Sequence, residues 1–140
     1  MAVALKRVYD LPAPQDGVRV LVDRLWPRGM TKEAAALDAW LKELAPSDEL
    51  RKWYHAHPEQ WSKFRERYLK ELSSEKAAAA LQQLYALRDA NRQLTLLFGS
   101  KNLEHNNATV LKKLMEGDRK PPKGTGPARA AKQARAVRRR

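Results

Sequence analysis

The spacing of hydrophobic positions along the chain predicts strands and helices in a mixed order. Residues 3–9, 18–22 and 93–98 are short apolar runs bounded by turn-forming residues, which predicts strands. Apolar side chains recur every three or four residues in longer stretches, which predicts amphipathic helices over 31–44, 47–54, 58–72 and 104–115, and from Ser73 or Ser74 to residue 90. The second half of 31–44 could instead be extended, because Pro46 disfavours helix at Ala45.

The order of these elements predicts the fold class. Strands come first, helices fill the middle of the chain, and a strand, a loop and a helix follow. The run 94–98 is too apolar for an exposed edge strand. Near-continuous apolar strands among amphipathic helices are typical of a parallel sheet with helices on its faces. We therefore predict a single small α/β domain whose mostly parallel sheet is covered by helices.

Positive charge is concentrated near the carboxyl end of the sequence. The 140 residues carry a formal net charge of +12, and residues 118–140 contain nine Lys or Arg and one acid. Because this segment has few apolar side chains and several Pro and Gly, we predict a folded domain over 1–117 and a disordered basic tail over 118–140. Such a tail either binds nucleic acid without reading its sequence or only keeps the protein in solution.

Composition excludes several classes of protein. The chain has no Cys, which excludes disulfides and thiol nucleophiles. Its three His form no His-Glu-x-x-His pair, so we expect no metal site, and no pattern points to a cofactor. No apolar run approaches the roughly 20 residues of a membrane span, and the first residues lack a secretory signal. We therefore expect a soluble cytoplasmic protein with no membrane partner.

The loop after the second predicted strand carries the first set of candidate site residues. It supplies one carboxylate at Asp23, two guanidinium groups at Arg24 and Arg28, and an indole at Trp26. Arg binds phosphates and carboxylates through two parallel hydrogen bonds, and Trp offers a surface on which a base or sugar stacks. These residues predict a site for an anion. The alternative is that the acid and an Arg form a structural ion pair while Trp26 fills a gap in the core.

The loop after the 93–98 strand carries the second set. It leads through Lys101 to His105, Asn106 and Asn107 at the start of a predicted helix, where free backbone N–H groups suit a phosphate or carboxylate. Lys101 adds a positive charge, and His105 could transfer a proton. The alternative is that Asn106 or Asn107 caps the helix and His105 is an ordinary surface residue.

A third stretch begins at Ser47, which follows Pro46 at a predicted helix start. No Gly-x-Ser-x-Gly motif surrounds it, so helix capping is the favoured role for Ser47. Arg51, one turn later, could reach a ligand or a carboxylate of the same domain. We keep Ser47 and Arg51 among the candidate ligand contacts.

Several of these strings together resemble the YeaO-like family of bacterial proteins. The most specific is Asp-Arg-Leu-Trp-Pro-Arg-Gly at 23–29, joined by Leu-Arg-Lys-Trp at 50–53 and Leu-Leu-Phe-Gly-Ser-Lys at 96–101. The resemblance covers roughly residues 3–116 and implies a small α/β domain with no assigned reaction. The chain departs from the family pattern at 55–58 and at 105–108, where Asn107 stands in place of a second His.

Three hypotheses for function follow. The leading hypothesis is that the protein binds an anionic small ligand between the two loops at the carboxyl edge of the sheet. This ligand would be a nucleotide, a nucleoside or a phosphorylated metabolite. Asp23 or His105 would then act as general acid or base, although the residues leave open whether the protein is an enzyme. The alternatives are a nucleic-acid-associated protein that uses residues 118–140 and a protein-interaction module built around Trp53 and Trp61.

Overall fold

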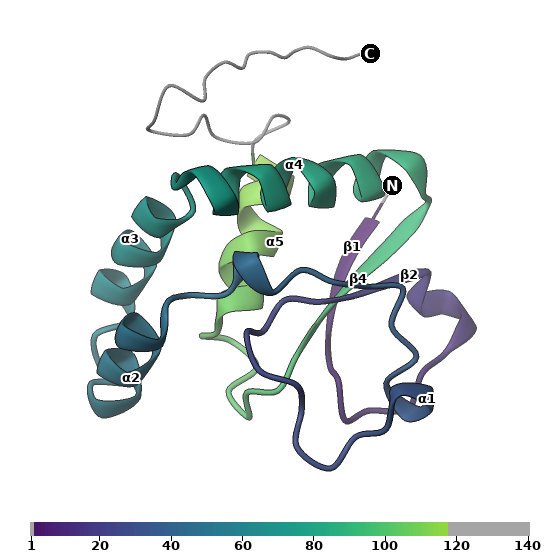
Figure 1. The fold of residues 1–140 in the computed structure, drawn as a ribbon, viewed down its shortest axis with the longest axis horizontal. Coiled ribbons are helices and arrows are strands. Elements are labelled where there is room, and N and C mark those ends of the chain that lie inside the picture. The colour runs from purple at the N-terminus through teal and green to yellow at the C-terminus, as the bar shows by residue number, and fades with distance from the viewer. Residues whose placement is uncertain (1, 118–140) are drawn as a thin grey trace.

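The computed structural model describes residues 2–117, so the predicted basic tail at 118–140 lies outside the described residues. The described part contains four strands, five α-helices and two 3₁₀ turns (Figure 1). In chain order these are β1 (Ala2–Arg7), η1 (Pro14–Asp16), β2 (Val18–Leu21), α1 (Lys32–Ala35), β3 (Ala39–Trp40), η2 (Lys42–Leu44), α2 (Asp48–Ala56), α3 (Trp61–Glu71), α4 (Glu75–Ala90), β4 (Gln93–Phe98) and α5 (Asn107–Gly117).

The four strands form one parallel sheet in the order β1-β4-β2-β3. One of its two interior strands is β4, which pairs with β1 from Ala2 opposite Gln93 to Arg7 opposite Phe98. On its other side β4 pairs with β2. Every residue of β4 after Gln93 is buried, as expected for a parallel strand covered on both faces. The predicted α/β class and the interior position of 94–98 are confirmed.

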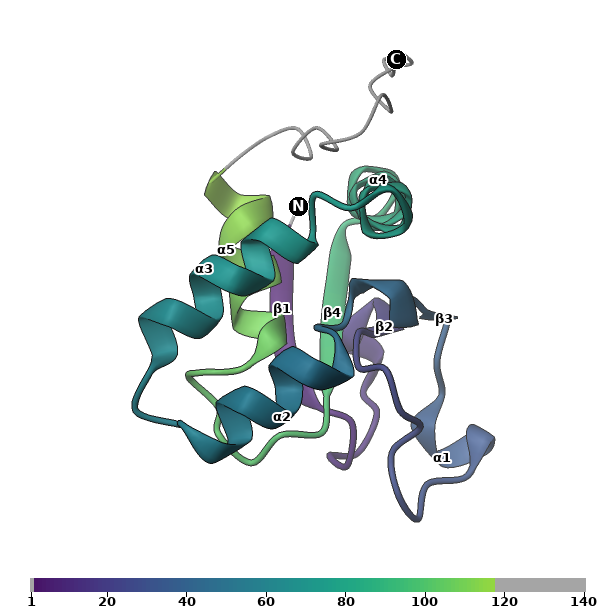
Figure 2. The ribbon, with the colours of Figure 1, turned by 60° about the vertical axis from the view of Figure 1, so that its left-hand side comes forward.

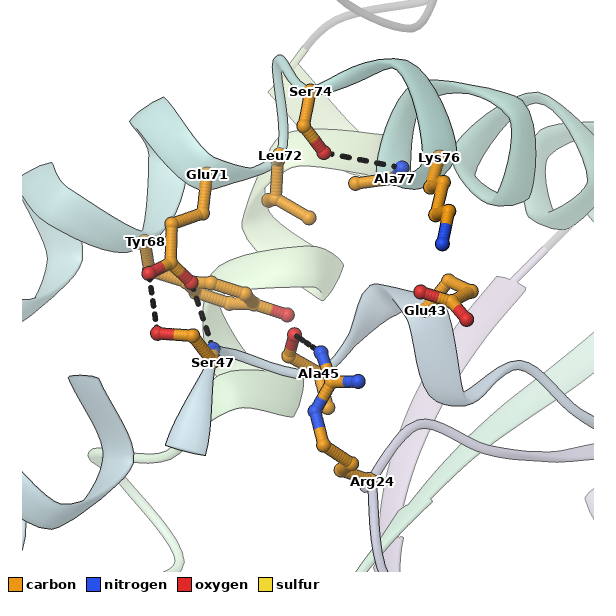
Figure 3. A pocket seen from close by; sticks show the side chains of 10 residues that line it. All are labelled: Arg24, Glu43, Ala45, Ser47, Tyr68, Glu71, Leu72, Ser74, Lys76 and Ala77. Atoms are coloured by element: carbon orange, nitrogen blue, oxygen red, sulfur yellow. Dashed lines mark hydrogen bonds between the residues drawn. The ribbon is translucent and has the colours of Figure 1, made fainter. Parts of the chain in front are cut away.

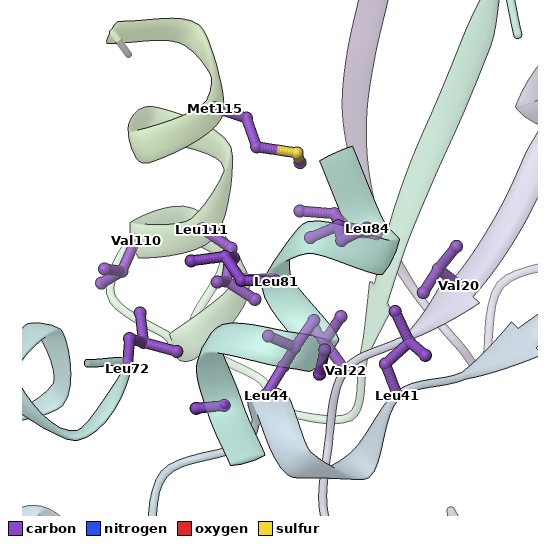
Figure 4. Close-up of a cluster of buried hydrophobic side chains, with 14 of the residues drawn as sticks. Val20, Val22, Leu41, Leu44, Leu72, Leu81, Leu84, Val110, Leu111 and Met115 are labelled. Carbon is purple, nitrogen blue, oxygen red and sulfur yellow. The ribbon is translucent and has the colours of Figure 1, made fainter. Parts of the chain in front are cut away.

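Alternate side chains of β4 enter two different clusters. Leu94, Leu96 and Phe98 face the main core, which α3, α4 and α5 close with residues such as Leu81 and Leu111 (Figure 4). On the opposite face Leu97 joins a smaller cluster with Val8, which directly follows β1, Leu21 of β2 and Ala35 of α1, and two partly buried indoles pack against this cluster. The helices are therefore concentrated on one face of the sheet, and α2 and α3 pair beside α5 (Figure 2).

The predicted helix over 31–44 is wrong beyond its first turn. Thr31 does cap a helix, but α1 ends where Ala36 adopts a left-handed conformation with φ of 48°. Asp38 then aligns with β2, because its carboxylate accepts from the Arg19 N–H at 2.8 Å and its own N–H donates to the Arg19 carbonyl at 2.8 Å. The extended alternative is therefore correct at Ala39–Trp40, which pair with β2, whereas the residues that follow, Lys42–Leu44, form the 3₁₀ turn η2.

Two predicted helix starts are wrong by three residues. The predicted start at Pro58 is instead a turn: His57 Nδ1 lies 2.9 Å from the Trp53 carbonyl oxygen, and α3 begins at Trp61. The last helix begins at Asn107 and not at residue 104, because the Asn102 side-chain oxygen accepts from the two backbone N–H groups of residues 104 and 105. The cap predicted at Ser47 is confirmed, and of the two serines at which the sequence predicts the start of α4, Ser73 and Ser74, it is Ser74 that caps the helix.

Candidate functional site

Asp23 joins the two loops that the sequence singled out. The loops follow β2 and β4, which are neighbouring parallel strands, so both leave the same edge of the sheet. One Asp23 oxygen accepts from the Gly99 N–H at 2.8 Å, and the other accepts from the Asn107 side-chain amide at 3.2 Å. Asn107 also donates to the Val22 carbonyl at 2.9 Å. The two loops therefore lie side by side, tied by one carboxylate.

The environment of Asp23 changes its titration. Burial raises the pKa of the Asp23 carboxyl above its ordinary value, while the hydrogen bonds from Gly99 and Asn107 act in the opposite direction. Both carboxylate oxygens already have partners within the protein. This arrangement suits a group that holds two loops together.

Arg24 and Trp26 direct their donors to backbone carbonyls. The Arg24 guanidinium donates to the carbonyl of Ala45 at 3.2 Å and to that of Pro46 at 3.4 Å. The Trp26 indole N–H donates to the Met30 carbonyl at 2.7 Å, within the same loop. The indole also meets Trp40 edge-on, with ring centroids 5.4 Å apart. These contacts stabilise the loop from within.

Arg28 and Lys101 are exposed and have no hydrogen bond or ion pair with any residue in the described range 2–117. Arg51 lies on the outer surface of α2, where it pairs weakly with Asp48 at 3.4 Å. Ser47 is an N-cap: its hydroxyl oxygen accepts from the Leu50 N–H at 3.1 Å. Arg28, Lys101 and Arg51 are thus exposed side chains, and Ser47 has the capping role that the sequence favours.

Asn106 caps α5. Its side-chain oxygen accepts from the Thr109 N–H at 3.0 Å, and the Thr109 hydroxyl accepts from the Asn106 N–H at 3.2 Å. With the N–H groups of residues 104 and 105 bound to Asn102, several of the amides that the sequence offered to a ligand are occupied by side chains. This helix start is organised by its own asparagines.

His105 lies flat against Trp61 from the start of α3. The two ring centroids are 4.5 Å apart and the planes differ by 10°. Beside this pair is a surface pocket of about 270 Å³, which we name the α3–α5 hollow and which is lined by Trp61, Arg65, Glu104, His105, Thr109, Val110 and Lys113. Arg65 and Lys113 are exposed and form no ion pair with another described residue. The hollow thus presents two positive charges next to an aromatic pair.

Sequence reasoning identified His105 but missed Trp61, Arg65 and Lys113 as possible ligand contacts. The available signal was their helical spacing. Trp61 and Arg65 are four residues apart on one helix, and Thr109 and Lys113 are four apart on another, so each pair lies on one helix face. Nothing in the sequence said that these two faces meet.

A second pocket, of about 310 Å³, lies at the beginning of α4, and we name it the α4 pocket (Figure 3). It is lined by Arg24, Glu43, Ala45, Ser47, Tyr68, Glu71, Leu72, Ser74, Lys76 and Ala77. Burial raises the pKa of Tyr68 well above its ordinary value, and the nearby charges of Asp23 and Glu71 add to that increase. The Tyr68 hydroxyl donates to the Leu44 carbonyl. Arg24 and Ser47 therefore share a pocket that does not include His105.

Trp53 and Trp61, the centre of the predicted interaction module, are both half-buried. Trp53 stacks with His57 at 5.2 Å between centroids, and the Arg67 guanidinium lies 4.3 Å from the Trp53 ring centroid.

Across residues 2–117 no helix has the length and apolar character needed to cross a bilayer. The same residues contain no group of three or more His, Asp or Glu side chains placed to hold a metal ion.

Comparison with known proteins identifies relatives. Residues 2–131 match a family model described as "Inactive DUF488-N3 subclade". The chain is 48% identical over 113 residues to the uncharacterized protein YeaO of Escherichia coli K12, covering 79% of this chain and 94% of that protein. It is 39% identical over 115 residues to the uncharacterized protein Rv3073c of Mycobacterium tuberculosis H37Rv, covering 82% and 94%. No solved structure is a significant match. The chain therefore belongs to the YeaO-like family of uncharacterised proteins, in the group described as the inactive DUF488-N3 subclade.

Proposed function

We propose that the α3–α5 hollow binds an anionic small molecule of the nucleotide or sugar-phosphate class, and that the protein holds this ligand without transforming it. One observation carries the proposal: the stacked Trp61–His105 pair is flanked by Arg65 and Lys113, two cations without an ion pair among the described residues.

Charge favours an anion in the hollow. Arg65 and Lys113 contribute two positive charges against the single negative charge of Glu104. Arg65 can give a phosphate two parallel hydrogen bonds, and Lys113 adds a compact positive charge from the facing helix. A phosphate between them would therefore contact both helices.

The aromatic pair supplies a second kind of contact. His105 stacks on Trp61 and is itself exposed, so a planar ligand in the hollow can reach the imidazole ring. Planar bases and sugar faces pack on such rings, and base stacking typically contributes about 1–3 kcal/mol. This contact distinguishes a nucleotide from inorganic phosphate.

Binding without turnover is supported by the state of the two candidate acid–base groups. Both Asp23 oxygens hold loop contacts, and His105 lines a different pocket from Arg24. The matching family model also carries the word "inactive" in its description. The anionic ligand that the sequence predicted is therefore kept in this proposal, but its phosphate partners become Arg65 and Lys113.

The test is calorimetric titration of the full chain with AMP, ribose 5-phosphate and adenosine. We expect AMP and ribose 5-phosphate to bind, and adenosine to bind more weakly because it lacks the phosphate. Replacing both cations, Arg65→Gln and Lys113→Gln, removes two charge-assisted hydrogen-bonding groups and should weaken AMP binding by at least about tenfold.

The matched control is Lys63→Gln, which removes an exposed positive charge from the same helix outside the hollow. It corrects for general attraction of anions to a basic protein. Equal affinity of AMP for the Lys63→Gln and Arg65→Gln/Lys113→Gln proteins would contradict the proposed site. Release of phosphate or adenine from AMP by the purified protein would contradict binding without turnover.

A further inference from the structure

The α4 pocket differs from the α3–α5 hollow in its charge, and this difference carries a separate inference. It holds two cations, Arg24 and Lys76, and two acids, Glu43 and Glu71, around a base of Ala45, Leu72 and Ala77 (Figure 3). The charges balance, so the pocket does not favour an anion over a cation. We propose that it binds a small zwitterion, a molecule that carries one carboxylate and one ammonium group.

The cations retain hydrogen-bonding capacity toward the pocket. Arg24 uses Nε and one terminal nitrogen on the carbonyls of Pro46 and Ala45, and its other terminal nitrogen has no partner within the described range. The Lys76 side chain is exposed and has no hydrogen bond or ion pair with residues 2–117. A ligand carboxylate beside them would accept hydrogen bonds from both Arg24 and Lys76.

Glu71 and Glu43 differ in whether their carboxylate oxygens already accept hydrogen bonds from the protein. Each Glu71 oxygen accepts one hydrogen bond from Ser47, at 2.8 Å from the backbone N–H and at 2.6 Å from the hydroxyl. Glu43 faces the pocket on the same side as Lys76 (Figure 3), yet it has no ion pair within 4.0 Å in the described structure. Glu43 is therefore the acid that is free to accept from a ligand ammonium group.

Size and lining agree with a ligand of this kind. The volume of about 310 Å³ corresponds to roughly ten water molecules at about 30 Å³ each, enough for an amino acid or a short amino carboxylate. The side chains of Leu72 and Ala77 are buried and apolar, so they offer contact to the carbon atoms between the two charged ends. A singly charged molecule would leave one pair of pocket charges unmatched.

The experiment compares probes that differ only in charge. The full chain, labelled with ¹⁵N, is titrated with 4-aminobutyrate and L-alanine as zwitterions and with butyrate and n-butylamine as singly charged controls. We expect saturable shifts of the amide signals of Ser47, Ser74 and Ala77 with at least one zwitterion. Butyrate and butylamine should bind at least about tenfold more weakly, because each makes only one of the two charge contacts.

Variants locate the effect. Lys76→Met and Glu43→Gln change exposed side chains, so the fold should tolerate them, and each should weaken zwitterion binding by at least about tenfold. Lys70→Met and Glu49→Gln, which change exposed charges outside the pocket, should leave the shifts unchanged. The proposal is overturned if neither zwitterion binds, if a singly charged probe binds as tightly, or if the pocket variants behave like their controls. Because AMP binding is assigned to the α3–α5 hollow, these results are independent of the proposed function.

Discussion

The sheet edge around Asp23 and the α3–α5 hollow contain the same kinds of residue in opposite states. At the edge, Arg24 and Trp26 donate to backbone carbonyls, and Asp23 accepts from two donors of the protein. In the hollow, Arg65 and Lys113 reach no acid or carbonyl among residues 2–117. Asp23, Arg24 and Trp26 of the first region thus hold the fold, although Arg28 and Lys101 in the same two loops are unpaired among residues 2–117, and both cations of the hollow are available.

The difference follows from backbone hydrogen bonding. The segments 22–30 and 45–47 are largely irregular, so many of their carbonyls lack partners from secondary structure and recruit side-chain donors instead. In the interior of α3 and α5 the backbone N–H and C=O groups pair with one another within each helix. They do not need side-chain donors, so the long side chains stay free. An Arg-Trp-Arg loop is thus a weaker indication of a ligand site than basic residues on two helices that face each other.

Among the substitutions that test this comparison between the sheet edge and the hollow, Asp23→Ala should have the largest effect on stability. Removing the carboxylate leaves the Gly99 N–H and the Asn107 amide without their acceptor, which should lower the free energy of unfolding by about 2 kcal/mol. Urea denaturation of the full chain measures this loss. Asp48→Ala, which removes an exposed carboxylate in a 3.4 Å pair, should cost less than about 0.5 kcal/mol. Equal losses for the two variants would show that Asp23 does not hold the loops.

A smaller effect is expected from Trp26→Phe, which separates stability from binding. The variant loses the indole N–H that donates to the Met30 carbonyl, so unfolding should become easier by about 1 kcal/mol. AMP affinity should not change, because Trp26 lies outside the hollow. The Arg65→Gln/Lys113→Gln protein should show the reverse pattern. A loss of AMP affinity in Trp26→Phe comparable to that double variant would place the ligand back at the loop.

The smallest effect concerns pH. Burial raises the pKa of Asp23 in the folded protein, so between the ordinary Asp pKa and this raised value the native state binds more protons than the unfolded state. Stability from this group therefore decreases as pH rises through that interval. The free energy of unfolding of the natural protein, compared with that of Asp23→Asn, should fall as pH increases from the ordinary Asp pKa of about 4 through the raised pKa of Asp23. Denaturation curves at several pH values measure the difference, and a constant difference would contradict it.

The parts of the fold that depend on local patterns could be predicted from the sequence. The helix at 75–90 has a Ser74 cap and a buried stripe that includes Leu81 and Leu84, and the strand at 93–98 is a continuous apolar run. The residues of the strand at Ala39–Trp40 do not by themselves predict a strand. It exists because Asp38 pairs with the backbone of Arg19 on β2, a contact that no local pattern encodes.

The same distinction applies to the candidate sites. The adjacency of the loops at Asp23 and Gly99 follows from the rule that parallel strands end at one edge, and His105 was correctly placed after β4. The grouping of Trp61 and Arg65 with Lys113 depends on how α3 packs beside α5, which is a tertiary outcome. The hydrogen bonds that occupy Arg24 and Trp26 are equally invisible in the sequence, since backbone carbonyls carry no residue signature.

The interior position of β4 in the sheet also has a consequence for the newly made chain. Both β1 and β2 pair with β4, which leaves the ribosome after α4, so β1 has no strand to pair with until most of the domain has been synthesised. Contacts such as that between Arg7 and Ser100 join residues 93 positions apart. Strand pairing between residues this far apart in sequence is slow, and the apolar strands stay exposed to solvent until it is complete. Completion of this fold during synthesis therefore depends on β4, the last strand of the described part to be made.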